Sequence, residues 1–375
     1  MAEGLELNCQ KEREPVNSMK LSTFKIAIFL MTAVTLWAAI FLAYTASANS
    51  VKPANEMNYE LISKFRFGRA VTNVAFSQDG NWVASASADG VAQILNLKNW
   101  ELIEIRHLYG NGGLPINSID FSYDGHFFAT ASSDGTTKIL NLKTRETKEI
   151  KHLYGVSHVR FSPDNQFVAT ASYDFTSKIL NLITGQSSEI KHLDRVFQVE
   201  FSPDSSYVAT ASLDGTSKIL NLRNGHIDEI KHQEGVVHVT FSPDSAFVAT
   251  ASYDGTSKIF NLKNGTTKEI RHYPGAELTK VTFSPDSVLV ATASGNGTVR
   301  IENLNSGATQ EIKHAPISDE VRWNVVEDIA FSPNGKFIAT ASQDGRAKIL
   351  SITNGLKIGK IAELKHKSGV LSVRF

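Results

Sequence analysis

The 375 residues are enough for two or more ordinary domains, and an apolar content of 42% with 20% charged residues indicates a globular chain. The 38 basic side chains balance the 38 acidic ones, which disfavours binding to nucleic acid. The only cysteine, Cys9, precedes the apolar segment described next, so the folded part can form neither a disulfide nor a cysteine-based zinc site.

A continuous apolar segment lies near the start of the chain. From residue 26 to residue 44 every residue is apolar or small except Thr32 and Thr35, and none is charged. At about 1.5 Å per residue, this length approaches the roughly 30 Å needed to cross a bilayer. Lys20 and Lys25 precede it, so the positive-inside rule places residues 1–25 in the cytoplasm and the chain after residue 50 on the exported side. The sequence therefore predicts a membrane helix at residues 26–48 and a linker at residues 49–58.

The fate of this segment has three alternatives. The chain stays anchored, or it is cleaved after Ala48, because residues 46–48 have the small-residue pattern of a signal-peptidase site. A start at Met19 would leave an ordinary bacterial signal peptide. Whether the segment stays anchored or is cleaved, the domain that follows it is expected in a bacterial periplasm or cell envelope. In the third alternative the segment is a tail-like anchor in reversed orientation, and the domain lies in the cytoplasm.

From residue 59 to residue 375 the chain repeats itself. Within residues 156–190, four strand-like runs, VSHVRF, QFVATAS, TSKILNL and QSSEI, are separated by turns rich in Pro, Asp and Gly. A period near 40 residues with four strands per unit predicts an all-β fold, a seven-bladed β-propeller of four-stranded antiparallel blades preceded by one N-terminal hydrophobic helix. The register follows Phe76, Phe121, Phe161, Phe201, Phe241, Phe283 and Phe331.

Two segments exceed the seven complete units. Residues 60–67 look like an additional outer strand, and residues 369–375 repeat the innermost strand of an eighth unit. A seven-bladed ring would leave both segments as surplus, whereas an eight-bladed ring would lack two strands in its last blade. We expect seven blades, and a pattern that breaks off before another Ser-Pro-Asp turn is typical of a shortened reading frame.

The strings FSPD, ATASxDGT and KILNL resemble those of the WD-repeat family over residues 59–375. In that family a histidine before the innermost strand, a serine or threonine on the second strand, an aspartate in the next turn and a tryptophan on the third strand form a buried hydrogen-bonded set. The resemblance implies a structural network at His107, Ser132 and Asp134; His152, Ser172 and Asp174; His192, Ser212 and Asp214; His232, Ser252 and Asp254; and His314, Ser342 and Asp344.

The chain departs from that family at the tryptophan. The Trp-Asp ending is replaced at Leu95-Asn96, Leu140-Asn141, Leu180-Asn181, Leu220-Asn221 and Phe260-Asn261. The sixth unit has His272 and Ser294 but carries Asn296 in place of the aspartate. A leucine fills the pocket but cannot donate a hydrogen bond, so we expect histidine and aspartate to carry the network, at about 1 kcal/mol for each bond.

No catalytic or cofactor motif stands out, since HExxH, GxSxG, a P-loop, GxGxxG opening a helix and an EF-hand loop are all absent from the sequence. The histidine, serine and aspartate recur once per blade, which indicates a structural set rather than a hydrolase triad placed against an oxyanion hole. His158 and His238 lie on innermost strands without further ligands, so packing explains them better than metal binding. We therefore predict a protein that is not an enzyme and uses no cofactor or metal.

The nearly identical units differ mainly in two loops. These are the loop after each histidine and the residue before each turn aspartate, which in the resembled fold share one face of the disk, here called the histidine-side face. Large aromatic and arginine side chains anchor many interfaces. The predicted partner-binding residues on this face are Tyr109, Tyr154, Tyr173, Arg195, Leu213, Tyr253, Tyr273 and Trp323. The alternative that these are ordinary loop residues stays open.

Together these observations favour a non-enzymatic interaction scaffold. We expect a monomeric propeller that binds a protein or peptide on its histidine-side face, on the exported side of a membrane that its N-terminal segment contacts. The alternative is an exported propeller that binds or hydrolyses a small molecule or glycan. That alternative needs convergent polar side chains around the central channel, and the sequence shows no such cluster.

Overall fold

β-strands follow one another along nearly all of the described chain. The structure is a computed structural model, and it describes residues 65, 67–110, 112–272, 276–314, 325–353, 356–366 and 368–375. The membrane helix predicted at residues 26–48 and the linker predicted at residues 49–58 lie outside these ranges. Within the described ranges, no helix has the length and apolar character that crossing a bilayer requires.

Four consecutive strands form each of seven antiparallel sheets, here numbered blades 1 to 7 in chain order. Blades 1 and 2 contain β1 (Val71–Phe76), β2 (Trp82–Ser87), β3 (Val91–Asn96), β4 (Leu102–Arg106), β7 (Ile116–Phe121), β8 (Phe127–Ser132), β9 (Thr136–Asn141) and β10 (Thr147–Lys151). Blades 3 and 4 contain β11 (Val156–Phe161), β12 (Phe167–Ser172), β13 (Thr176–Asn181), β14 (Ser187–Lys191), β15 (Val196–Phe201), β16 (Tyr207–Ser212), β17 (Thr216–Asn221) and β18 (Ile227–Lys231).

The remaining blades follow the same plan. They contain β19 (Val236–Phe241), β20 (Phe247–Ser252), β21 (Thr256–Asn261), β22 (Thr267–Arg271), β23 (Leu278–Phe283), β24 (Leu289–Ser294), β25 (Thr298–Asn303), β26 (Thr309–Lys313), β27 (Val326–Phe331), β28 (Phe337–Ser342), β29 (Arg346–Thr353) and β30 (Lys357–Lys365). A short pair, β5 (Leu108–Tyr109) and β6 (Gly112–Gly113), joins blades 1 and 2. The prediction of seven four-stranded antiparallel blades is confirmed.

The first hairpin of blade 3 shows how the local sequence makes a turn. Ser162 Oγ donates to Asp164 Oδ1 at 2.6 Å and accepts the N–H of Phe167 at 2.9 Å. Serine and aspartate commonly bond to nearby backbone in this way, and Asn165 takes the left-handed conformation that the turn needs, at φ 62°. The Ser-Pro-Asp string therefore closes β11 onto β12.

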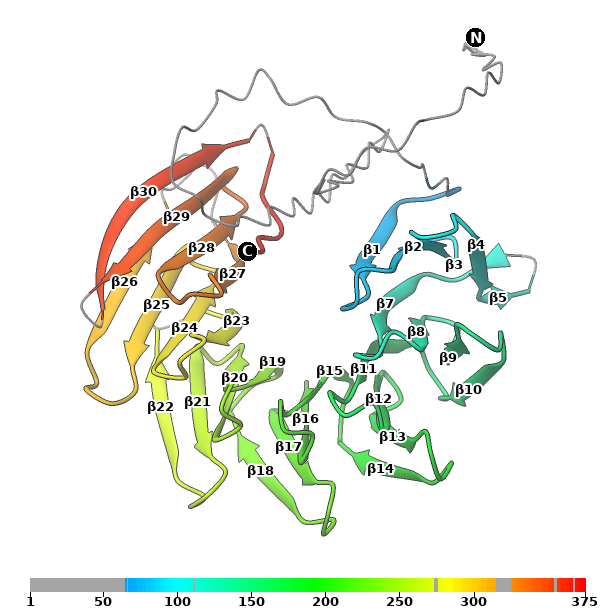
Figure 1. Ribbon diagram of the computed structural model, residues 1–375. Coiled ribbons are helices and arrows are strands. Elements are labelled where there is room, and N and C mark those ends of the chain that lie inside the picture. The colour runs from blue at the N-terminus through cyan, green and yellow to red at the C-terminus, as the bar shows by residue number, and fades with distance from the viewer. Residues whose placement is uncertain are drawn as a thin grey trace, which may run out of the picture.

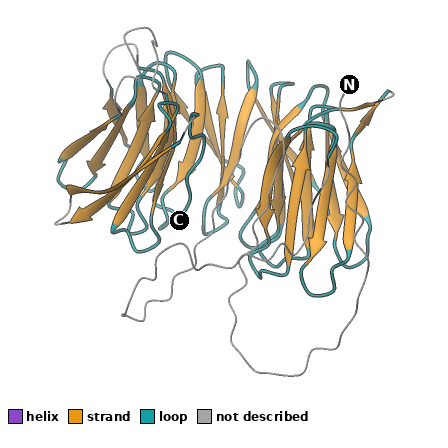
Figure 2. Cartoon of the chain, turned by 90° about the horizontal axis from the view of Figure 1, so that it is seen from above, coloured by secondary structure: helices purple, strands orange, loops and turns teal. Residues whose placement is uncertain are grey.

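The sheets stand side by side around a common centre, with the first strand of each blade innermost (Figure 1). The apolar core lies between neighbouring blades: Ala169 and Ala171 of β12 pack with Val199 and Phe201 of β15. Each blade therefore depends on its neighbours to bury its faces. The strands run across the thickness of the disk, so the loops gather on two opposite faces (Figure 2).

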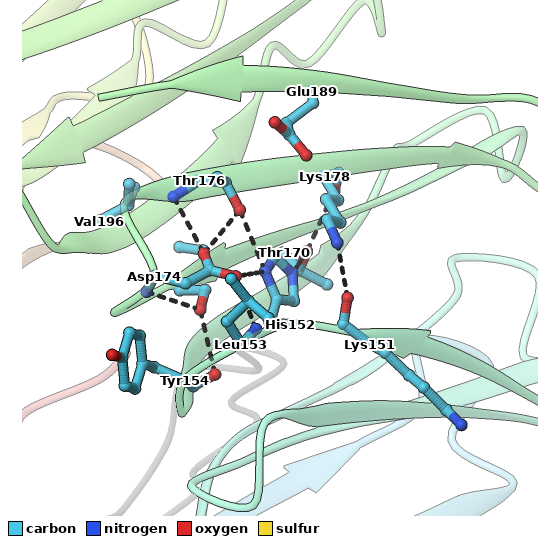
Figure 3. A network of polar contacts seen from close by, with 12 residues as sticks. Lys151, His152, Leu153, Tyr154, Thr170, Asp174, Thr176, Lys178, Glu189 and Val196 are labelled. Carbon is cyan, nitrogen blue, oxygen red and sulfur yellow. Dashed lines mark hydrogen bonds and ion pairs between the residues drawn. The ribbon is translucent and has the colours of Figure 1, made fainter. Parts of the chain in front are cut away.

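A basic side chain on the third strand ties each of blades 2 to 7 to the blade before it. Lys178 Nζ of β13 donates to the backbone oxygen of Lys151, the last residue of β10, at 2.6 Å (Figure 3). The sequence does not reveal these contacts, because the partner is a backbone carbonyl rather than a side chain. The equivalent donors are Lys138, Lys218, Lys258, Arg300 and Lys348.

Candidate partner-binding face

A buried histidine links the loop before blade 3 to two strands of that blade (Figure 3). His152 Nδ1 lies 3.0 Å from Asp174 Oδ2, in the β12–β13 turn, and Nε2 lies 2.8 Å from Thr170 Oγ1, on β12. Thr176 Oγ1 donates to Asp174 Oδ1 at 2.6 Å. Since the ionised carboxylate only accepts, the Nδ1–H of His152 donates to it, and Nε2 accepts the hydroxyl proton of Thr170. The histidine therefore fixes the loop against the turn.

The serine that the sequence analysis placed in this set has other partners. Ser172 Oγ donates to the backbone oxygens of Tyr154 and Gly155 at 3.2 Å and accepts the N–H of Asp174 at 3.1 Å. It therefore closes the β12–β13 turn, and Thr170, two residues earlier, meets the histidine instead. The same holds in the other blades of the network, where Thr130, Thr210, Thr250 and Thr340 contact the histidine.

The network recurs around the ring with small changes. The sixth blade keeps the His272 contact to Thr292 at 2.6 Å, but Asn296 bonds only within its own turn, to Ser294 and Thr298. The histidine Nδ1 to aspartate Oδ2 distances are 2.9 Å for His107–Asp134, 3.1 Å for His192–Asp214, 3.3 Å for His232–Asp254 and 3.1 Å for His314–Asp344.

Burial and hydrogen bonding set the charge states of the network. Burial lowers the pKa of His232 to about 4, although the carboxylate of Asp254 opposes the shift. Burial raises the pKa of Asp214, but hydrogen bonds from Leu193 and Thr216 outweigh this effect and hold the pKa at about 2. At neutral pH His232 is thus neutral and Asp214 is ionised, which is the state that their hydrogen bonds require.

The leucine-asparagine ending has a structural role of its own. Asn181 Oδ1 accepts the N–H groups of Ile183 and Thr184, both at 2.9 Å, and so caps the β13–β14 turn. The leucine before it belongs to the core between blades, as shown by Leu140 and Leu220, both of which are buried. This ending therefore supports the turn and the packing without an indole donor.

The network holds exposed apolar side chains on the histidine-side face. The N–H of Leu153 donates to Asp174 Oδ2 at 2.9 Å, and that of Leu193 donates to Asp214 Oδ2 at 2.8 Å. Yet the two side chains are 87% and 90% exposed. Neither leucine was predicted from the sequence, because leucine is less typical of interface anchors than aromatic residues and arginine. Because their backbones are held by hydrogen bonds and their side chains are exposed, Leu153 and Leu193 are the strongest candidates on this face for contact with a partner protein.

The residues predicted for this face fall into two groups. Tyr154, Arg195 and Tyr253 are exposed, and Tyr173 and Leu213 are half-buried. The ring of Tyr173 packs edge-on against Phe197, with 5.9 Å between centroids. The structure thus places these five in the same set of loops. Tyr273, Trp323 and the side chain of Tyr109 lie outside what the structure describes.

Phe175 adds a strained aromatic residue to this face. It has φ 71° in a turn where Gly135, Gly215 and Gly255 stand in the neighbouring blades, at φ 84°, 82° and 78°. A Cβ at Gly135 would lie 3.0 Å from the backbone oxygen of His152, so a side chain at this place is crowded as well. Nevertheless Phe175 is 42% exposed and gains little burial in return. A strained residue with an exposed ring is typical of a functional position.

We expect Phe175→Gly to raise the free energy of unfolding by about 1 kcal/mol, because glycine has no left-handed penalty. Chemical denaturation of the purified protein measures it. Phe175→Ala is the matched control: it removes the ring but keeps the Cβ, so it should give no gain. Equal stabilisation by both variants would show that the ring, and not the backbone, carries the strain.

The innermost strands carry ionisable side chains that contact the neighbouring blade. His158 Nδ1 lies 3.1 Å from the backbone oxygen of Val199, and Arg160 lies 3.5 Å from Glu200. His238 Nδ1 is buried without a hydrogen-bond partner, and burial lowers its pKa to about 3. Among the described residues, no three or more His, Cys, Asp or Glu side chains gather closely enough to hold a metal ion.

A known protein family shares this architecture. The model of a family described as the IFT122 first beta-propeller matches residues 70–351, which run from the start of β1 into β29. The chain belongs to this family. It is therefore a WD-repeat-like β-propeller, an architecture that indicates a protein-interaction scaffold. No curated protein matches the sequence.

Proposed function

We propose that this propeller is a non-enzymatic scaffold that binds a protein or peptide through its histidine-side face. The observation that carries the proposal is the pair Leu153 and Leu193, whose side chains are almost fully exposed while their backbones are fixed by buried aspartates. Exposing two leucines on rigid loops gains nothing for folding. It does provide preorganised apolar anchors, which lowers the entropy that a partner must lose on binding.

Neighbouring side chains extend these anchors into one surface. His192 N–H donates to the backbone oxygen of Phe175 at 2.8 Å, which brings the Phe175 turn next to the Leu193 loop. Tyr154 follows Leu153 directly and is 64% exposed. Tyrosine and phenylalanine combine large contact area with few rotatable bonds, and such side chains dominate interface hot spots. The surface therefore fits an apolar segment of a partner protein.

The location of the scaffold follows from the N-terminal segment. The uncharged run at residues 26–44 with Lys20 and Lys25 before it supports export of the propeller, either anchored at a bacterial membrane or released after Ala48. Protease treatment of intact cells tests this part of the proposal. Degradation of the propeller by a protease confined to the cytoplasm would contradict it.

We expect the double variant Leu153→Ser, Leu193→Ser to weaken partner capture at least about tenfold, because each lost anchor is worth about 1 kcal/mol or more. Tyr173→Ala with Tyr253→Ala should have a similar effect. The measurement is cross-linked affinity purification from intact cells followed by quantitative mass spectrometry, which also identifies the mature N-terminus.

Ile183→Ser is the matched control for this experiment. Ile183 is 74% exposed, but it lies in the β13–β14 turn, on the opposite face of the disk. This variant should capture the partner normally. If Ile183→Ser reduces capture as much as the double leucine variant does, the loss is not specific to the histidine-side face and the proposal fails.

A further inference from the structure

Three basic side chains lie on the innermost strands of blades 3, 5 and 6. His238 of β19 and Lys280 of β23 hold the same place in their hairpins, opposite Ala251 and Ala293 of the second strand. Arg160 lies near the end of β11. These strands surround the centre of the ring (Figure 1), and all three residues are partly exposed. Their side chains therefore meet solvent near the centre of the ring.

The three side chains act on one another although they come from different blades. Burial lowers the pKa of His238 to about 3, and the positive charges of Lys280 and Arg160 add to this shift. The pKa of Lys280 is lowered mainly by burial, and Arg160 again adds to the shift. Charges in salt solution act over about 10 Å or less. Since blades 3 and 6 lie three places apart in the ring, Arg160 and Lys280 must interact across its centre.

The carboxylates beside these cations already have partners. Asp328 accepts hydrogen bonds from Lys280 and, at 2.8 Å, from Ser372. Its side chain is 4% exposed, so these bonds lie out of water. Asp120 Oδ2 accepts the N–H of Phe161 at 2.8 Å. The carboxylates therefore offset the positive charge, but their acceptor oxygens are largely occupied.

The hydrogen-bond donors, by contrast, are incompletely used. A guanidinium carries five N–H donors and an ammonium carries three. Among the described residues, Arg160 bonds only at 3.5 Å, to Glu200 and to a backbone oxygen of its own strand, and Lys280 bonds only to Asp328. His238 Nδ1, a donor in one of the two neutral tautomers, is buried without a partner in the described part of the chain. This cluster therefore has more donors than acceptors.

We propose that the centre of the ring binds a small organic oxyanion between Arg160, His238 and Lys280. Carboxylate and phosphate oxygens only accept hydrogen bonds, and guanidinium groups bind them in a bidentate geometry. Either group supplies the acceptors that these three side chains lack. The sequence does not predict this convergence, because the three residues lie in different repeats. The site is separate from the histidine-side face and does not rest on the binding of a protein there.

Citrate and inorganic phosphate are the probes, each titrated into the full chain at pH 7 in about 150 mM NaCl, which screens exposed charges. We expect isothermal titration calorimetry to show saturable binding of at least one of them. Binding of citrate alone identifies a carboxylate ligand, and binding of phosphate alone identifies a phosphate ligand. Nitrogen NMR of the histidine side chains should show a saturable shift at His238 and none at His226, whose side chain is 66% exposed.

Arg160→Gln should weaken binding at least about tenfold, because it removes a charged donor from the anion. Arg223→Gln is the matched control: it removes the same charge from an exposed residue in the β17–β18 turn and should leave binding unchanged. Absence of saturable binding of both probes would overturn the proposal, as would equal affinities of the two variants. Should Arg160→Gln not fold, the unchanged chain decides, since binding without a shift at His238 places the anion elsewhere.

Discussion

Lowering the pH from 7 to 4 is expected to unfold the propeller. The pKa values of His232 and His272 are lowered by burial from 6.5 to about 4, so both histidines are neutral in the folded protein. Unfolding returns them to ordinary values, and the unfolded chain then binds more protons. The stability that the neutral histidines contribute is therefore complete above pH 6.5 and is lost as the pH falls toward 4.

The size of the effect follows from the shifts. Each of these two histidines lowers the free energy of unfolding by about 3 kcal/mol between pH 7 and pH 4. The free energy of unfolding of a whole domain is only about 5–15 kcal/mol. His152, His192 and His314 act in the same direction, since burial also lowers their pKa values. Below pH 3.8 the loss of the Asp214 carboxylate, whose pKa is about 2, adds to the destabilisation.

Urea unfolding followed by circular dichroism, repeated from pH 7.5 to pH 4, measures this decline. His226→Gln is the control, because the side chain of His226 is 66% exposed and should not alter the slope. A free energy of unfolding that stays constant over this range would mean that the histidines bind protons equally in the folded and unfolded chain, and the lowered pKa values of His232 and His272 would then be wrong.

Asp214→Ala is expected to cost about 3 kcal/mol of stability, because it leaves a buried group of donors without an acceptor. The carboxylate accepts from His192 Nδ1 at 3.1 Å, from Leu193 N–H at 2.8 Å, and from the N–H and hydroxyl of Thr216 at 2.8 Å and 2.7 Å. Its side chain is 5% exposed, so water cannot readily replace it. Chemical denaturation at pH 7 measures the loss.

Blade 6 supplies the matched control for this variant. Asn296 stands where the other blades have aspartate, and its Oδ1 still accepts the N–H and hydroxyl of Thr298 at 3.1 Å and 2.7 Å. We therefore expect Asp214→Asn to cost clearly less than Asp214→Ala. If the two variants are equally unstable, the charge of Asp214 matters more than its hydrogen bonds, and the network is misinterpreted.

Much of the fold is determined by the sequence alone. The turn residues and the alternating apolar runs recur every 40 or so residues, and such local patterns define strands and hairpins without knowledge of the neighbours. The histidine and aspartate pairs of five blades were found in the same way, since both residues belong to the repeated motif. Their contact needs only the fold that the repeat implies.

Other features depend on what lies beside a residue in space. Thr170 and Ser172 are two residues apart on β12, so alternation places both on the same side of the sheet, and only the structure shows that the threonine meets His152. The exposure of Leu153 likewise depends on the Asp174 turn that holds its backbone. The clearest case is Val74, which has the same motif as Val159 but is exposed because no described blade covers it. Burial depends on the neighbouring blades of the assembled ring, so the sequence of one repeat does not determine which of its residues are buried.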